Sequence, residues 1–323
     1  MKKVFEFKKQ RNFDDIIESS FRFFRLHIKK IIQIFWKYNK ITTLGLFISY
    51  FFYNYYAFQL TNFLFGVKNK NIESGAVDSL WLGLVNLVFV VFSFIFFVRF
   101  VLTIFGYIKS YIKNEGQIKE KEVMDLVNTK FWPFVGASFL LVLLLIIIIV
   151  LGTLFFLGFS KMGSFGVAIA VLLFLPLVFY IITFMNLYFQ VYIFDEVSAS
   201  EAISLTMSYL KDKFWFSFLV TFVLGIIIWL LGMVFNAPIL IYSFIKGLML
   251  AKDPDVINQM TQGDLFISFF SLISLAGETV LKVLSVIGGV ILYYTLKEYH
   301  TNEGLLEKLE RLNAKNNNDE SQA

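Results

Sequence analysis

Long, uninterrupted blocks of apolar residues constrain the fold of this chain more than any other feature. A helix that crosses a bilayer needs about 20 mostly apolar residues, because the hydrocarbon layer is about 30 Å thick. One block contains the run LLVLLLIIII at 140–149, which the surface of a water-soluble helix does not carry. Only 16% of the residues are charged, against about 25% in typical soluble domains. The sequence therefore predicts a membrane protein.

Six stretches are long and apolar enough to span a membrane, and backbone groups inside lipid must be bonded within each segment, so helices are expected. The predicted fold class is all-α: a polytopic membrane helix bundle with six transmembrane helices arranged as three hairpins. The predicted spans are 41–60, 79–105, 134–158, 165–190, 214–236 and 265–294. Pro238 interrupts the pattern after the fifth span, and we expect the apolar residues up to about 250 to form a re-entrant or interfacial piece.

The distribution of basic residues predicts the orientation. With the N-terminus inside, 22 of the 29 Lys and Arg residues fall on the cytoplasmic side, which follows the positive-inside rule. We expect an N-terminal cytoplasmic amphipathic helix at 1–40, a transmembrane domain at 41–294 and a cytoplasmic tail at 295–323, so both termini are cytoplasmic. The high content of Phe, Ile, Lys and Asn is typical of AT-rich bacterial genomes and favours a bacterial inner membrane.

An internal repeat is marked first by the dipeptide Phe-Trp, which occurs three times. Its tryptophans are Trp36, Trp132 and Trp215, each at the start of an odd-numbered span. A tryptophan at that position keeps its ring in the headgroup layer and its N–H hydrated. We interpret the three residues as interfacial anchors.

A second marker follows each even-numbered span. A tyrosine, an Asn or Asp three residues later and then a glutamate recur at the same spacing: Tyr111 to Glu115, Tyr192 to Glu196 and Tyr299 to Glu303. The predicted repeat unit is therefore a hairpin of two spans, a cytoplasmic turn and a short helix that leads to the next Phe-Trp.

The short helices are expected to be amphipathic and to lie along the cytoplasmic membrane surface. They fall within 1–40, near 119–131 and near 198–213, with apolar stripes at Ile17, Phe21, Phe24, Ile28 and Ile31; at Val123, Leu126, Val127 and Phe131; and at Ile203, Met207, Leu210 and Phe214. The alternative is that such stripes belong to ordinary helices facing a protein core. Ser198-Ala-Ser-Glu201 is a capping-box pattern that predicts the start of the third helix.

The stretch VSASEAISLTMSYLKDKFWFSFLVTFVLGIIIWLLG (197–232) resembles uncharacterised bacterial six-span membrane proteins related to the membrane domain of glycerophosphodiester phosphodiesterases. The matching positions are Glu201, Ala202, Lys211 and Phe214-Trp215. The resemblance implies an integral membrane protein. It does not carry hydrolase activity over, because the chain shows no corresponding catalytic domain.

Residues suited to catalysis are scarce. The chain has no cysteine and only two histidines, His27 and His300, which excludes thiolate metal sites, cysteine nucleophiles and four-histidine iron centres. We expect both histidines to be interfacial or solvated. Phosphate-binding, serine-hydrolase and zinc-protease motifs do not occur. We predict no catalytic residue, metal or cofactor, and a net charge of +5, scattered along the chain, gives no reason to expect nucleic-acid binding.

Three ionisable residues fall within the predicted spans. Glu278 and Lys282 are one helical turn apart in the sixth span, and ionisable groups at that depth usually face a protein interior or a wet cavity. They could form an ion-coupling site or a headgroup site, or simply neutralise each other. Arg99 lies near the cytoplasmic end of the second span, where we expect its side chain to extend towards the headgroups.

Two functional hypotheses follow. The first is a non-enzymatic membrane protein that organises lipids or binds other membrane or cytoplasmic proteins. The second is a transporter of a small solute, ion or lipid that uses the Glu278/Lys282 region.

Overall fold

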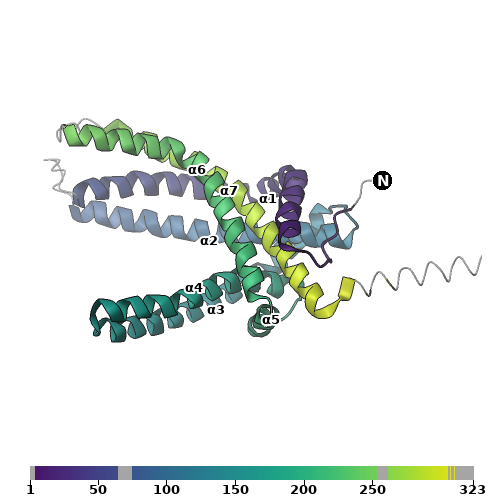
Figure 1. Cartoon of the computed structure of the whole chain (residues 1–323). Helices are drawn as coiled ribbons and strands as arrows, with labels where there is room; N and C mark the ends of the chain where they lie inside the picture. Colours follow the sequence, from purple (N-terminus) through teal and green to yellow (C-terminus); the bar gives the residue numbers. More distant parts are fainter. Residues whose placement is uncertain (1–3, 65–74, 253–260, 305, 307–308, 310–323) are drawn as a thin grey trace, which may run out of the picture. The chain divides into compact units, whose positions relative to one another are not determined.

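The computed structural model describes residues 4–64, 75–252, 261–304, 306 and 309. Within these residues the chain forms seven helices and no strand (Figure 1). The all-α prediction is therefore confirmed for the described chain. The helices are α1 (Phe13–Leu64), α2 (Gly75–Lys113), α3 (Glu120–Ser160), α4 (Gly163–Phe194), α5 (Ala199–Lys211), α6 (Phe214–Lys252) and α7 (Thr261–Thr301). Most of the predicted tail, from residue 310 on, lies outside the described residues.

Five helical segments in the described chain are long and apolar enough to cross a membrane, which indicates a membrane protein. They are Trp81–Lys113, Glu120–Ser160, Gly163–Phe194, Phe214–Ile245 and Leu265–Thr301. The first predicted span, 41–60, is helical as part of α1 but is not among these five. The arrangement of six spans in three hairpins therefore stays a prediction.

The helices are longer and less interrupted than the sequence pattern indicated. The predicted boundary between residues 40 and 41 is a kink inside α1, where Asn39 leaves the helical conformation (φ −123°, ψ 25°). The segments 119–131 and 134–158 form one helix, α3, with Pro133 inside it. Pro133 lacks an N–H for the carbonyl of Thr129, but Thr129 is exposed, so this carbonyl can be solvated.

The prediction of a separate piece after Pro238 is wrong. Helix α6 continues through this proline to Lys252. A proline inside an apolar helix is tolerated when neighbouring helices or local adjustments satisfy the carbonyl that it frees. By contrast, α5 begins where the capping pattern predicted, because the Ser198 hydroxyl accepts a hydrogen bond of 3.3 Å from the N–H of Glu201.

The described helices belong to two compact units. Unit 1 comprises Met1–His27, Ile104–Gly225 and Leu284–Ala323, and unit 2 comprises Ile28–Thr103 and Ile226–Val283. Helices α3, α4 and α5 lie wholly in unit 1. Helices α1, α2, α6 and α7 each contribute one part to either unit.

In unit 1, α3 and α4 form an antiparallel hairpin (teal in Figure 1). At 41 residues, α3 is about 60 Å long, twice the thickness of the hydrocarbon layer. Its buried residues all lie between Val123 and Leu141, and those of α4 lie from Thr183 to Ile193 apart from two small residues. The other end of the hairpin exposes mostly apolar side chains. One end is therefore packed against protein, and the other is suited to lipid.

The core of unit 1 is rich in aromatic residues. Its fully buried side chains include Tyr107, Tyr188, Tyr293, Phe23, Phe105 and Phe134. Burying one such side chain contributes about 2 kcal/mol. Gly106 allows α2 to approach α3 closely, since a Cβ there would lie 3.1 Å from the backbone oxygen of Val123.

In unit 2, the described parts of α1 and α2 pack through phenylalanines. The ring of Phe35 contacts those of Phe96 and Phe100 edge-on, with centroids 5.2 and 5.3 Å away. The parts of α6 and α7 in this unit meet where the Ser274 hydroxyl donates to the backbone oxygen of Phe235 at 2.8 Å.

Candidate functional site

The carboxylate of Glu278, on the candidate span of α7, bonds to the neighbouring helix within unit 2. Its Oε1 accepts a hydrogen bond of 2.9 Å from Nδ2 of Asn236 on α6. Asn236 also donates to the backbone oxygen of Gly232 at 3.1 Å. A polar bond between two apolar helices can hold them together, and it also places an ionisable group inside the bundle.

Lys282 does not neutralise Glu278. Both residues are described, yet no ion pair within 4.0 Å joins them, and the Lys282 side chain is exposed. The neutralised-pair interpretation therefore does not describe this structure. Exposed on an apolar helix, Lys282 can extend its ammonium group towards the headgroups.

Arg99 connects α2 to the kink of α1. Its Nη1 donates to Oδ1 of Asn39 at 3.1 Å, and Asn39 in turn donates from Nδ2 to the backbone oxygen of Phe35 at 3.2 Å. Asn39 is 2% exposed. The kink is thus fixed by a buried amide that Arg99 holds in place.

The three Phe-Trp pairs expose their tryptophans. Trp36, Trp132 and Trp215 are 45%, 75% and 68% exposed. The three rings are therefore accessible to lipid headgroups, and their role as interfacial anchors stays a prediction.

The repeated turns share a left-handed residue. Glu115 and Glu196 have φ values of 48° and 56°, at equivalent positions of the first two turns. In the third turn the left-handed residue is Asn302 (φ 50°), one position before Glu303. The third turn is therefore offset by one residue from the spacing in the sequence. Asparagine adopts this conformation more readily than glutamate.

The Asn or Asp of each turn bonds to another part of unit 1. Asn114 donates to Glu122 Oε2 at the start of α3 at 2.7 Å, and Asn302 Oδ1 accepts from Gln10 at 3.1 Å. Asp195 makes the largest number of such bonds and forms the centre of the site described next. These side chains therefore attach each turn to a neighbouring segment of unit 1.

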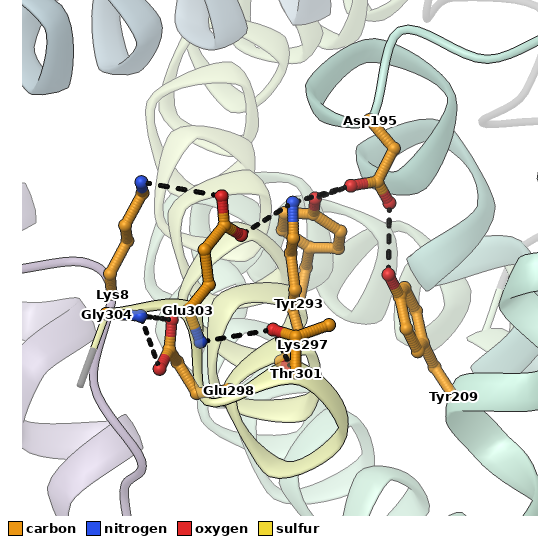
Figure 2. Close-up of polar contacts among 9 residues, drawn as sticks. All are labelled: Lys8, Asp195, Tyr209, Tyr293, Lys297, Glu298, Thr301, Glu303 and Gly304. Carbon is orange, nitrogen blue, oxygen red and sulfur yellow. Dashed lines mark hydrogen bonds and ion pairs between the residues drawn. The ribbon is translucent and has the colours of Figure 1, made fainter. Parts of the chain in front are cut away.

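Asp195 lies at the centre of a group of polar residues from α4, α5 and α7, shown in Figure 2. Its Oδ1 accepts from the Tyr293 hydroxyl at 2.7 Å and pairs with Lys297 Nζ at 2.9 Å, and its Oδ2 accepts from the Tyr209 hydroxyl at 3.4 Å. The Asp195 side chain is only 9% exposed. We call Asp195, Tyr209, Tyr293, Lys297, Glu303 and Lys8 the Asp195 cluster.

The cluster continues to the two terminal segments. Lys297 also pairs with Glu303 at 3.1 Å, and Glu303 lies 3.9 Å from Lys8 Nζ. Below them, both carboxylate oxygens of Glu298 accept from the N–H of Gly304, at 2.9 and 3.0 Å (Figure 2). These contacts hold the turn after α7 and the segment before α1 against the same end of unit 1.

The segment before α1 docks through further contacts. The N–H of Phe5 donates to the Tyr111 hydroxyl at 2.8 Å, and Gln10 donates to the backbone oxygen of Glu298 at 3.0 Å. The guanidinium of Arg11 is buried and donates to the backbone oxygens of Glu6, Phe7 and Lys9. Burial lowers the pKa of Arg11, which still keeps its charge because its ordinary pKa is so high.

Besides Arg11, Tyr209 and Glu196 also lie outside the candidate spans and have shifted pKa values. Burial, followed by the nearby Asp195 charge, raises the pKa of Tyr209 to about 12. The hydrogen bond and the charge of Lys109 lower the pKa of Glu196, with which Lys109 forms an ion pair. Both shifts favour the protonation state that the fold uses at neutral pH.

Both histidines contact aromatic side chains. His27 Nδ1 lies 2.8 Å from the Tyr107 hydroxyl, and its ring stacks on Phe23 at 4.2 Å. His300 packs beside Tyr209 at 5.4 Å. His27 is therefore half-buried and packed against protein, and its position at the membrane interface stays a prediction. Over the residues that the structure describes, no group of three His, Cys, Asp or Glu side chains could hold a metal ion.

The Asp195 cluster was largely missed by sequence reasoning. The turn pattern singled out Glu303 and included Asp195, but not Tyr209, Tyr293 or Lys297. A signal was present, since Asp195 is the one acidic residue at the Asn/Asp position of the three turns.

No protein-family model, curated protein or solved structure matches this chain. The resemblance to the membrane domain of glycerophosphodiester phosphodiesterases therefore stays a prediction, and function is argued from the geometry of the two units.

Proposed function

We propose that the chain is a non-enzymatic integral protein of a bacterial cytoplasmic membrane, with both termini in the cytoplasm, that organises lipids or partner proteins. One observation carries the proposal: each unit 1 hairpin helix is packed and polar at one end and apolar and exposed at the other. The charges of the Asp195 cluster bond to one another and fix the packed end. Such an arrangement builds a rigid base on a lipid-embedded hairpin.

Topology tests the membrane part of this proposal. Green fluorescent protein fused after residue 323 should fluoresce, and alkaline phosphatase at the same position should be inactive. Alkaline phosphatase inserted beside Lys161, between α3 and α4, should be active. Periplasmic reporter activity at both chain ends would contradict the proposed orientation.

A transporter is the second candidate, because Asn236 holds the Glu278 carboxylate between two apolar helices. Purified protein in vesicles that contain a pH-sensitive dye distinguishes the two proposals for protons, and other solutes can be screened in the same vesicles. The organiser proposal expects the flux of empty vesicles. Flux that Glu278→Gln abolishes, while Lys161→Gln leaves it intact, would establish transport instead.

A further inference from the structure

The exposed face of α1 in unit 2 changes from basic to apolar at the kink. Before Asn39, the exposed residues include Lys29, Lys30, Trp36 and Lys37, and Lys40 is exposed directly after it. After it, the exposed side chains are apolar and begin with Ile41, which is 84% exposed, followed by Leu44, Ile48 and Phe52. These positions recur at three- and four-residue spacing, so they share one side of the helix.

Three lysines of this face, Lys29, Lys30 and Lys40, have no carboxylate close to their ammonium groups in the described structure. No acidic residue occurs in the sequence between Glu18 and Glu73. In the described structure, no carboxylate lies within 4.0 Å of Lys29, Lys30 or Lys40. Lys37 extends over the ring of Tyr38, with its Nζ 5.1 Å from the centroid. The face therefore attracts anions.

The partner of this face must combine an anionic group with an apolar part. Seven residues of helix separate Lys37 from Leu44, which is about 10 Å. A phospholipid matches this distance, because its phosphate lies at the level of interfacial aromatic residues and its acyl chains continue alongside the apolar surface. A soluble phosphate would leave Ile41 and Leu44 exposed to water.

We propose that this face of α1 preferentially binds anionic phospholipids, with Lys37 and Lys40 at the phosphate and Lys29 and Lys30 at the headgroup side. The proposal rests on the proposed membrane role and names its lipid class. Each lysine near an anionic surface contributes about 1 kcal/mol of attraction. The bond from Arg99 to Asn39 positions the kink, so that the two lysines beside it stand at a defined level.

Trp36 is the reporter for the test. A single-tryptophan protein, with Trp81, Trp132, Trp215 and Trp229 changed to Phe, is reconstituted into vesicles of equal parts phosphatidylcholine and phosphatidylglycerol. Bromine on the acyl chains of one lipid or the other then quenches the fluorescence of Trp36. We expect quenching by the brominated anionic lipid to exceed that by the neutral lipid at least about twofold, and this preference to fall to about one in Lys37→Gln/Lys40→Gln.

The matched control is Lys121→Gln/Lys161→Gln, which removes the same charge from exposed positions outside this face and should keep the preference. Equal quenching by the two lipids in the parent protein would overturn the lipid preference and leave the membrane proposal standing. A preference that survives Lys37→Gln/Lys40→Gln would also overturn it. Quenching by neither lipid would place Trp36 outside the membrane and would also overturn the lipid preference, whereas the topology reporters test the membrane proposal separately.

Discussion

The Asp195 carboxylate accepts a hydrogen bond of 2.7 Å from the hydroxyl of Tyr293, 98 residues later in the chain. Because Lys297 pairs with the same oxygen, this one carboxylate joins the end of α4 to α7. Its side chain is 9% exposed, so these bonds are largely shielded from water. A buried polar group that loses its hydrogen-bond partner lowers the free energy of unfolding more than an exposed group does.

This bond predicts a measurable coupling. Tyr293→Phe removes one hydroxyl and should lower the free energy of unfolding by about 1 kcal/mol, and Asp195→Asn, which removes a charge facing Lys297, by about 2 kcal/mol. In the double variant the losses should be less than additive. Chemical unfolding in mild detergent measures all three. Tyr180→Phe, on α4, should change stability by less than about 0.5 kcal/mol. Fully additive losses in the double variant would contradict the coupling.

The ion pair between Glu196 and Lys109 predicts a pH dependence. The pKa of Glu196 is lowered, so its contribution to stability is complete above the ordinary glutamate pKa and is lost as pH falls through the lowered value. Glu196→Gln should therefore be less stable than the parent at pH 7, and the difference should vanish in acid. Thermal unfolding between pH 3 and 7 measures this. Glu18→Gln, at an exposed position of α1, should show no such dependence of stability on pH. A stability loss in Glu196→Gln that stays constant from pH 3 to 7 would refute the interpretation.

The left-handed conformation of Glu115 predicts a stabilising substitution. A residue with a Cβ loses about 1 kcal/mol of conformational free energy in the left-handed region that Glu115 adopts, and glycine does not. Glu115→Gly should therefore raise the free energy of unfolding by up to about 1 kcal/mol. The control Lys121→Gly places glycine in the first turn of α3, where no left-handed residue is required, so it should not stabilise the protein. Similar losses in both variants would show that the Glu115 side chain outweighs the strain.

The close approach of α2 to α3 at Gly106 predicts that bulk is not tolerated there. A Cβ would lie 3.1 Å from the backbone oxygen of Val123, so Gly106→Val must separate the helices and should cost about 2 kcal/mol or more. Gly136→Ala is the control, because nothing lies within 4 Å of a Cβ at that position. Unfolding in detergent should show the control to be neutral or slightly stabilised. Equal stability of the two variants would place the helices farther apart than described.

The buried side chain of Arg11 predicts that its removal lets the segment before α1 detach more often. Its guanidinium donates to the backbone oxygen of Phe7 at 2.8 Å and to that of Lys9 at 3.2 Å. Arg11→Met leaves these oxygens without their donor, a loss of about 2 kcal/mol that should expose the segment roughly 30-fold more often. Faster trypsin cleavage after Lys8 and Lys9, read by mass spectrometry, measures it. Arg22→Met, at an exposed position, should leave the cleavage rate unchanged.

The apolar blocks and the Ser198 cap could be predicted from sequence because both are local. A span is recognised from its own composition, and a capping box from four consecutive residues. Helix continuity at Pro133 and Pro238 could not be predicted, since whether a proline ends a helix depends on what satisfies the carbonyl that it frees. For this reason the sequence predicts separate helices at 119–131 and 134–158, whereas these segments form the single helix α3.

The amphipathic stripes show the same limit. Val123 and Val127 of the second stripe are buried in protein, as the core-facing alternative expects, whereas Met207 of the third is exposed and Ala202 and Thr206 face the core. Apolar character alone does not distinguish a lipid contact from a protein contact. The Asp195 cluster could not be assembled from sequence either, because its members are brought together only by the packing of α4, α5 and α7.

The contact between Gln10 and Glu298 also determines when the segment before α1 can dock fully during synthesis of the chain. These residues are 288 positions apart, and a ribosome that adds about 5–20 residues each second needs roughly 15–60 s to bridge that interval. Throughout this time the leading segment has no acceptor at Glu298. Gln10 therefore gains this contact only once α7 has been synthesised, and a nascent chain halted before this helix holds the segment before α1 through fewer contacts.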